Sequence, residues 1–190
     1  MKIFIICSKQ FYPEVKDVKE QLEKQGNEVF LPNCYDEPDT ELKMKKMGVK
    51  EHQEFKARMY KQSEDVIKQS DAVLVLNYDK EKDGKVYKNY IGGATFLEMY
   101  DAFRLGKEIY MMNDIPEGML YDEIDGFSPV IIHGDVSLLQ EAFGCSYAEF
   151  CKEVVPNITK PTPVEYPETY QFMSKKDKKK LLLEKGKDTE

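Results

Sequence analysis

Short apolar runs alternate along the chain with longer segments in which apolar residues recur at helical spacing. The runs are rich in β-branched and aromatic residues and end at glycine, proline or polar residues, which is typical of buried strands. Because they are apolar almost throughout, they favour parallel strands covered on both faces. Five strands are predicted, at 2–7 (KIFIIC), 28–32 (EVFLP), 71–77 (DAVLVLN), 107–112 (KEIYMM) and 129–134 (PVIIHG).

The segments between these runs have the period of amphipathic helices. In the first segment, Val15, Val18 and Leu22 fall on one helical face, and Gly26 is a suitable C-terminal stop. Further helices are predicted at 51–70, from the glycines at 92–93 to about 105, and at 135–144 with Asp135 as N-cap.

Strands that alternate with helices predict an α/β fold. We expect a three-layer, doubly wound, five-stranded parallel sheet with the flavodoxin-like strand order 2-1-3-4-5. In such sheets ligands bind beyond the carboxyl ends of the strands, where the strand order reverses. That edge should collect the loops at 7–12, 32–50, 77–93 and 112–117.

Two segments interrupt the alternation. The polar stretch 33–50 is long for a structureless connection and is predicted to be a functional loop or partly helical. Its lysines, Lys43, Lys45 and Lys46, are either a cover for a phosphate or a solvated charge run. The domain is expected to span 1–150, and a proline- and lysine-rich tail 151–190 to be an arm on a neighbouring subunit or disordered.

Composition and charge narrow the class of partner. The chain has 190 residues and a net charge of −7, which argues against a nucleic-acid polymer because phosphate backbones require a positive surface. No apolar run is long enough to span a membrane, and no secretory leader is recognisable. The four cysteines are scattered and neither histidine has a ligand-spaced neighbour, so we expect reduced thiols, a cytoplasmic location and no metal site.

The segment NYIGGATFLEMYDA (89–102) carries the candidate chemistry. Gly92 and Gly93 precede a helix whose first turns hold Thr95 and, among apolar neighbours, Glu98. A helix N-terminus offers unpaired N–H groups and favours anions, including an ionised carboxylate. Such a carboxylate can attack an electrophilic carbon such as C1′ of a sugar. The alternative is that the glycines form a tight turn and Glu98 is an ordinary first-turn acid.

The strand DAVLVLN, followed by GGATFLEMYDAFRLGKEIYMM, resembles the nucleoside 2-deoxyribosyltransferases and their relatives, the deoxynucleoside 5′-monophosphate N-glycosidases. The family has a D-S-G-T-like turn after this strand and a glutamate three residues after the threonine. The opening KIFIICSK is also similar to the family's first strand. The resemblance implies a small nucleoside or nucleotide substrate, no cofactor and a homo-oligomer.

Carried over, Glu98 matches the nucleophile that attacks C1′, and Asp71 an acid that handles the base. Thr95 and the backbone of Gly92 and Gly93 match the turn that holds the sugar or its phosphate. Ser8 and Lys9 fall where the loop after the first strand reaches the substrate, and Lys9 would suit a 5′-phosphate. These assignments are implied by the resemblance alone.

The chain also departs from the family pattern. The aspartate usually found six residues before the glutamate is Gly92 here. We expect Asn89 to substitute for it as a polar contact. The pattern GG…T…E is similar, less closely, to the signature of the cytokinin-activating phosphoribohydrolases, which split the same type of bond. The sequence therefore predicts cleavage of an N-glycosidic bond, with hydrolysis of a nucleotide favoured over transfer. A non-catalytic nucleotide sensor on the same fold is the alternative.

Overall fold

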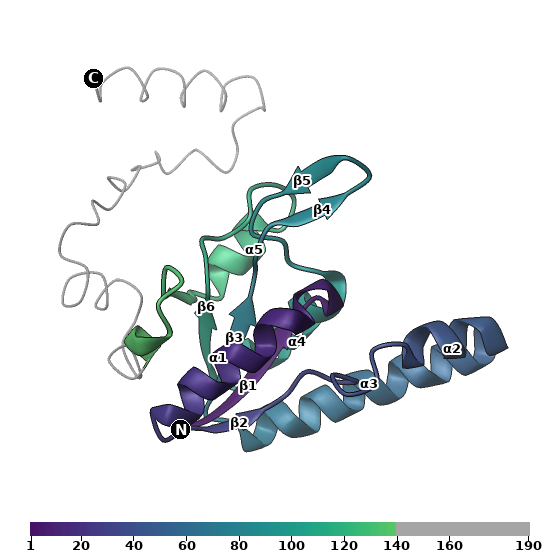
Figure 1. Ribbon diagram of the computed structural model, residues 1–190, viewed down its shortest axis with the longest axis horizontal. Coiled ribbons are helices and arrows are strands. Elements are labelled where there is room, and N and C mark those ends of the chain that lie inside the picture. The colour runs from purple at the N-terminus through teal and green to yellow at the C-terminus, as the bar shows by residue number, and fades with distance from the viewer. Residues whose placement is uncertain (140–190) are drawn as a thin grey trace, which may run out of the picture. The chain divides into compact units, whose positions relative to one another are not determined.

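The computed structural model describes residues 1–139 of the chain (Figure 1). Its centre is a parallel sheet with the order β2-β1-β3-β6-β7, which confirms the predicted order 2-1-3-4-5. All five predicted strands are present, although most are shorter than the apolar runs that predicted them. The strands are β1 (Lys2–Cys7), β2 (Glu28–Phe30), β3 (Ala72–Leu76), β6 (Glu108–Met111) and β7 (Val130–Ile131).

The two central strands, β1 and β3, form the middle of the core. Every residue of β3 is buried, and Ile5 of β1 pairs with Leu74 in parallel register. Successive side chains point to opposite faces of a sheet, so each central strand supplies apolar groups to both helical layers. Because β3 and the buried part of β1 are apolar, these strands require helices on both sides.

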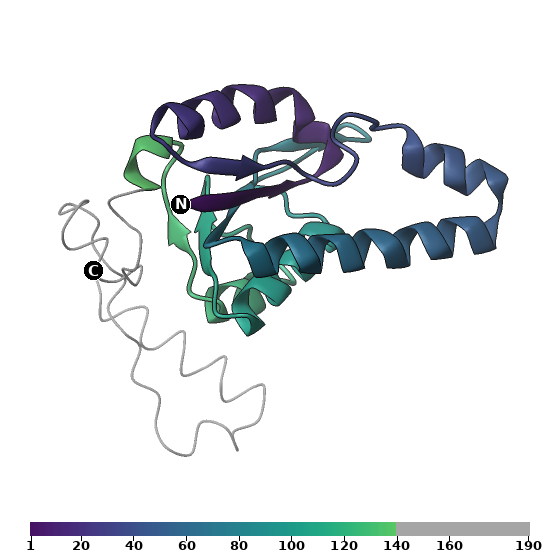
Figure 2. The ribbon, with the colours of Figure 1, turned by 90° about the horizontal axis from the view of Figure 1, so that it is seen from below.

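Those helices cover the sheet in two layers (Figure 2). One face carries α1 (Tyr12–Lys24), which buries Val15, Val18 and Leu22 as the spacing predicts. The other face carries α3 (Val49–Gln69) and α4 (Gly93–Arg104). The short helix α5 (Tyr121–Gly126), which the sequence did not predict, adds Ile124 to the core on that side.

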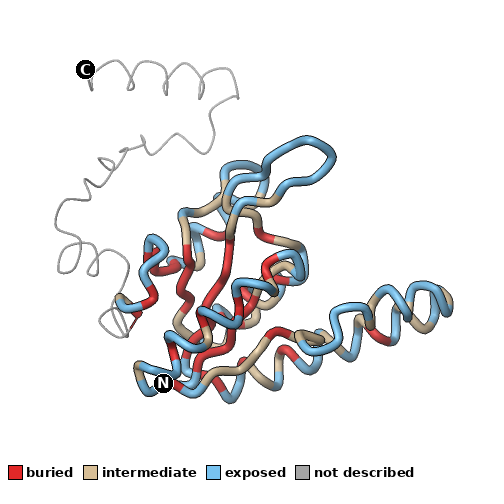
Figure 3. Tube along the Cα trace, in the orientation of Figure 1, coloured by how far each residue is buried: buried red, intermediate tan, exposed pale blue. Residues whose placement is uncertain are grey.

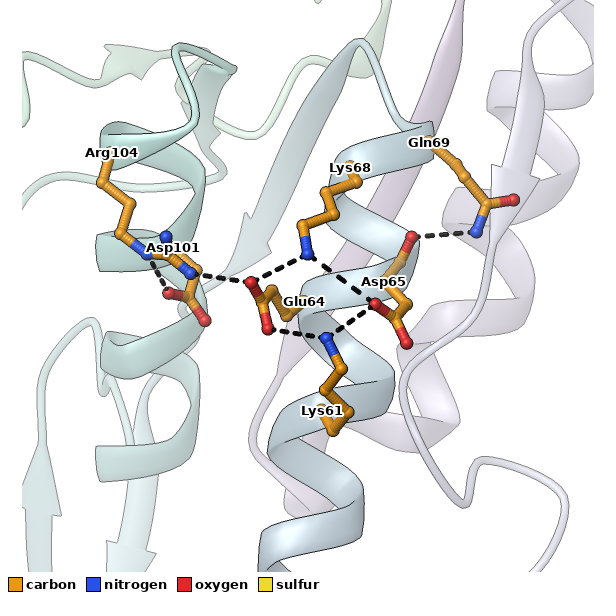
Figure 4. A network of polar contacts seen from close by, with 7 residues as sticks. All are labelled: Lys61, Glu64, Asp65, Lys68, Gln69, Asp101 and Arg104. Carbon is orange, nitrogen blue, oxygen red and sulfur yellow. Dashed lines mark hydrogen bonds and ion pairs between the residues drawn. The ribbon is translucent and has the colours of Figure 1, made fainter.

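A network of ion pairs joins α3 to α4 at the surface (Figure 4). The carboxylate of Glu64 lies 2.9 Å from Lys68 and 3.2 Å from Lys61 on its own helix. It also accepts a hydrogen bond of 3.1 Å from Arg104 of α4, which in turn donates to Asp101 at 2.7 Å. The network thus links the two helices through charge in addition to their apolar packing.

The polar stretch 33–50 is partly helical, as expected. It contains α2 (Thr40–Met47), which packs on the N-terminal part of α3 and ends at Gly48. No residue of α2 is buried, and Figure 3 shows this helix in the colours of intermediate and exposed residues. With so little apolar contact, α2 depends on polar contacts for its position.

A β-hairpin occupies part of the segment that the sequence predicted to be a loop. Its strands are β4 (Lys80–Lys82) and β5 (Lys85–Tyr87), which pair antiparallel. The turn between them is Asp83-Gly84, with φ angles of 53° and 71°. Positive φ at both central residues is the geometry of a type I′ turn, for which Asp-Gly is a preferred sequence. The turn dipeptide was therefore the missed signal.

The described part of the chain ends within the last predicted helix. Asp135 caps the 3-10 turn η2 (Val136–Leu138) by accepting the Ser137 N–H at 2.9 Å, which confirms its role as N-cap. The rest of the helix predicted at 135–144 and the tail at 151–190 lie outside the described residues. None of the helices within 1–139 has the length and apolarity needed to cross a membrane.

Candidate active site

A cavity of about 500 Å³ lies at the carboxyl edge of the sheet. Its walls come from the segments that follow β1 and β2, from one face of α3, from α2 and from the first turns of α4. The sheet topology brings these segments together, because the carboxyl ends of β1 and β3 are neighbours where the strand order reverses. Six predicted site residues line the cavity: Ser8, Lys9, Gly92, Gly93, Thr95 and Glu98.

The start of α4 aims its N-terminus at this cavity. Gly92 is the N-cap, with φ −82° and ψ 159°, and neither glycine of the pair has a positive φ angle. A Cβ added to Gly93 would meet no atom within 4 Å, whereas one at Gly92 would lie 3.6 Å from the Tyr90 ring. Close contacts therefore do not require glycine at either position. Both residues line the cavity at the end of the helix, where free N–H groups favour an anion.

Glu98 lies one turn into α4, and its carboxylate contacts α3. Oε1 accepts a hydrogen bond of 2.6 Å from the Ser63 hydroxyl. Burial raises the pKa of Glu98 to about 7, although the Ser63 hydrogen bond and the charge of Lys56 partly oppose this shift. Glu98 is half-buried at the cavity wall and is thus ionised above neutral pH, which is a suitable state for a nucleophile or a base.

Ser63 is itself held by a residue from the loop after β2. Asn33 Nδ2 donates to Ser63 Oγ at 2.7 Å and to the Met59 carbonyl at 3.0 Å. The Tyr12 hydroxyl donates to the carbonyl oxygen of Asn33 at 2.7 Å. The environment of Glu98 is therefore built from α1, the loop after β2, and α3.

A cluster of basic side chains surrounds one carboxylate, that of Glu41 on α2. Its oxygens lie 2.9 Å from Lys9 Nζ, 3.3 Å from His52 Nε2, 3.7 Å from Lys45 Nζ and 3.8 Å from Lys56 Nζ. Partial burial alone would raise the pKa of Glu41, but the hydrogen bonds from Lys9 and His52 and the charge of Lys56 outweigh it and lower the pKa to about 2. Glu41 is therefore an ionised counter-ion at every physiological pH.

The hairpin contributes a further cation to the cavity, next to an aromatic ring from the segment that follows it. Lys80 of β4 and Tyr90 both line it, with Lys80 Nζ 4.1 Å from the centre of the Tyr90 ring. This cation–π contact connects the hairpin to the segment that leads into α4.

Asp71 lies at the opposite edge of the sheet from Glu98. It precedes β3, and its carboxylate accepts the Lys2 backbone N–H at 2.7 Å. It does not line the cavity, so the structure does not bring it together with Glu98 as its expected role in handling the base requires. The physical reason is that all strands of a parallel sheet run in the same direction. Residues that precede a strand therefore lie at the amino edge of the sheet, and residues that follow a strand lie at its carboxyl edge.

Asn89 is also outside the cavity. Its N–H donates to Asp79 at 3.0 Å, and it lines a separate hollow together with Ile115 and Leu120. Of the lysines considered as a phosphate cover, Lys45 lines the cavity. Within residues 1–139, no three histidine, cysteine or acidic side chains are grouped so as to hold a metal ion.

Several cavity residues carry no motif and were not predicted as site residues. Lys56, Tyr60 and Ser63 share one face of α3 at spacings of four and three residues, continuous with its apolar stripe. Asn33 follows β2 and Tyr12 follows β1, so both lie at the carboxyl edge of the sheet. That position could have identified them as candidate site residues. For Glu41 the sequence offers no comparable signal.

A scan against protein-family models finds no match, and neither does a search of curated proteins. Among solved structures, a 2-deoxyribosyltransferase of the psychrotolerant bacterium Bacillus psychrosaccharolyticus is 19% identical with a TM-score of 0.48, covering 79% of this chain and 96% of that one. The CMP N-glycosidase of Clostridium botulinum is 19% identical with a TM-score of 0.42, covering 74% and 96%.

Proposed function

We propose that this protein hydrolyses the N-glycosidic bond of a nucleoside 5′-monophosphate, with Glu98 as the nucleophile. The observation that carries the proposal is a carboxylate with a pKa near neutrality at the start of α4, in a cavity that also holds a cluster of lysines. The first feature suits attack on an anomeric carbon, and the second suits a phosphate.

The reaction divides into two displacements at C1′. In the first, an oxygen of ionised Glu98 forms a bond to C1′ while the C1′–N bond breaks, and its electron pair leaves with the base. The departing base takes a proton from water. In the second, a water molecule attacks C1′, loses a proton to solvent and releases Glu98 as a carboxylate.

The charges around the cavity support an anionic substrate. The chain as a whole has a net charge of −7, yet this cavity has more cations than anions. A local excess of one sign concentrates ligands of the opposite sign. The lining comprises Lys9, Lys45, Lys56 and Lys80 against Glu41 and Glu98.

A non-catalytic nucleotide sensor is the second candidate, and one observation favours it. The carboxylates that line the cavity within the described residues are Glu41 and Glu98. Since the pKa of Glu41 is lowered to about 2, it cannot protonate a leaving base near neutral pH. In a sensor, Glu98 would contact ribose hydroxyls only.

A homo-oligomer and a cytoplasmic location stay predictions.

The test is base release by the full chain from a panel of nucleosides, deoxynucleosides and their 5′-monophosphates, followed by chromatography. We expect release from at least one monophosphate and loss of at least about a thousandfold in Glu98→Gln. Glu54→Gln, on the exposed face of α3, is the matched control and should be unaffected. If no substrate yields free base while nucleotides raise the melting temperature, the sensor replaces the enzyme. Unchanged release by Glu98→Gln contradicts the assigned nucleophile.

A further inference from the structure

Glu98 is the end point of a chain of hydrogen bonds that crosses three parts of the fold. The Met59 carbonyl accepts from Asn33 Nδ2 at 3.0 Å, and the same nitrogen donates to Ser63 Oγ at 2.7 Å. Ser63 then donates to Glu98 Oε1 at 2.6 Å. Ser63 is only 3% exposed, so its hydroxyl has little competition from water.

The direction of this chain follows from the donors and acceptors available. A backbone carbonyl can only accept, so the Met59 carbonyl requires the nitrogen of the Asn33 amide to face it, because a flipped amide would oppose two oxygens. The same nitrogen therefore donates to Ser63 and occupies an acceptor site on its oxygen. A serine hydroxyl has one hydrogen, and that hydrogen is left for Glu98.

Oε1 of Glu98 is consequently an acceptor in both protonation states of the carboxyl group. When Glu98 is neutral its proton is on Oε2, and when it is ionised Oε2 is the oxygen without the Ser63 hydrogen bond. We infer that Ser63, oriented by Asn33, is a positioning residue that holds Oε1 of Glu98 and leaves Oε2 to react. This inference rests on the proposed function for its kinetic consequence, but its structural part can be measured without catalysis.

Other groups also face Glu98, and none duplicates Ser63. Lys56 of α3 favours the carboxylate by its charge, and Asp101 of α4 disfavours it. Cys7 of β1 and Tyr12 of α1 are neutral near pH 7. Burial raises the pKa of the Cys7 thiol to about 12, and it also raises the pKa of the Tyr12 phenol above its ordinary value. Within residues 1–139, Ser63 is the hydrogen-bond donor to the Glu98 carboxylate.

The position of Ser63 matters most in the second displacement. After Oε2 has bonded to C1′, Oε1 is the carbonyl oxygen of the glycosyl ester. When water attacks C1′, the electron pair of the breaking C1′–Oε2 bond returns to the carboxylate, and negative charge develops on both oxygens. The Ser63 hydroxyl, already aimed at Oε1, stabilises that charge as it forms.

The experiment uses Ser63→Ala in the full chain, with Ser70→Ala as matched control. Ser70 follows the same helix and is 1% exposed, but its hydroxyl donates to the Val66 carbonyl at 2.9 Å and does not line the cavity. The pKa of Glu98 is measured from the carboxyl carbon signal of protein labelled with 13C-glutamate. We expect an upward shift of about one pH unit in Ser63→Ala, since a hydrogen bond to the charged form is lost. Ser70→Ala should not shift.

A second variant, Asn33→Asp, perturbs the chain with a side chain of nearly the same shape. The ionised carboxylate that this substitution introduces would accept the Ser63 hydrogen and turn it away from Glu98, and its negative charge also disfavours ionisation of Glu98. The Glu98 pKa should therefore rise further than in Ser63→Ala. If Glu98 titrates at the same pH in wild type, Ser63→Ala and Asn33→Asp, the inference is overturned.

A shift of the Glu98 pKa in a protein that releases no base supports the positioning role and refutes the enzymatic function. Base release whose pH dependence is the same in wild type and Ser63→Ala supports the function and refutes the inference.

Discussion

Lys9 Nζ lies 2.9 Å from the Glu41 carboxylate, so the segment after β1 is joined to α2 across the cavity. His52 and two further lysines approach the same carboxylate. The cations need a counter-ion when no ligand is bound, and Glu41 provides it. A phosphate that enters the cluster would compete with Glu41 for the same donors.

Glu41→Gln is therefore expected to bind inorganic phosphate more tightly than the wild type, by roughly three- to tenfold for these partly exposed ion pairs. Isothermal titration calorimetry at low and high salt measures the effect, which should shrink as salt screens the charges. Glu54→Gln removes an exposed ion pair with Lys50 and serves as the control. Weaker or unchanged binding in Glu41→Gln would mean that the lysines serve only to hold α2.

The proposed activity should rise with pH until Glu98 is ionised. Because burial raises the pKa of Glu98 to about 7, kcat is expected to increase about tenfold per pH unit below that value and to level off above it. The profile of kcat is the one to measure, since the second ionisation of a free nucleotide phosphate, near pH 6, affects only kcat/KM. A kcat that falls above pH 7 would identify Glu98 as a proton donor instead.

The raised pKa of Glu98 also has a cost in stability. Between about pH 4.5 and 7 the folded state keeps a proton that the unfolded state has released, so the free energy of unfolding falls as pH rises through that window. Glu98→Gln removes this penalty and should be more stable than wild type above pH 7, by on the order of 3 kcal/mol. Urea unfolding checks the difference, which should nearly vanish at pH 4.5. Equal stability at pH 8 would show that Glu98 is better solvated than its position indicates.

The preference for a phosphate should depend on Lys9. In Lys9→Gln the ratio of kcat/KM for a nucleotide to that for its nucleoside is expected to fall about tenfold or more, since a charge-assisted contact is lost. Lys19→Gln is the control, because Lys19 pairs with Glu23 on the outer surface of α1. An unchanged ratio would assign the phosphate to another part of the cavity.

The surface network around Glu64 is expected to affect stability and not chemistry. Hydrogen bonds from Lys68, Lys61 and Arg104 lower the pKa of Glu64 to about 2. Glu64→Gln should lower the melting temperature at low ionic strength, with a smaller effect at high salt because exposed ion pairs are screened. The pH dependence of kcat should stay that of the wild type. A shifted kcat profile would show that the network acts on Glu98 through the contact between α3 and α4.

Much of the fold was predictable because the pattern of apolar residues shows which segments must be buried. β3 is apolar at every position, and its place at the centre of the sheet follows from the need to cover both faces. The hairpin was less accessible, because its strands are polar and only the Asp83-Gly84 turn distinguishes them from a loop. The helix α5 is short and has one buried residue, Ile124, too few to establish a period.

The candidate site was predictable where a motif carried it and not where tertiary contacts did. Glu98 and the glycines stand in one continuous segment, whereas Ser63 and Asn33 acquire their importance from a meeting of α3 with the loop after β2. A lone serine on an amphipathic helix has no distinguishing pattern. Asp71 shows the opposite case, since a resemblance assigned it a role that its position before β3 does not support.

The shallow packing of α2 has a further consequence. A helix without a buried side chain that is held by charges around Glu41 should open locally at a lower free-energy cost than α1 or α4, which bury side chains in the core. Its backbone amides should exchange hydrogen for deuterium before those of α1 or α4. If this opening admits the ligand, the association rate, and not only the affinity, will depend on the ionic strength of the solution.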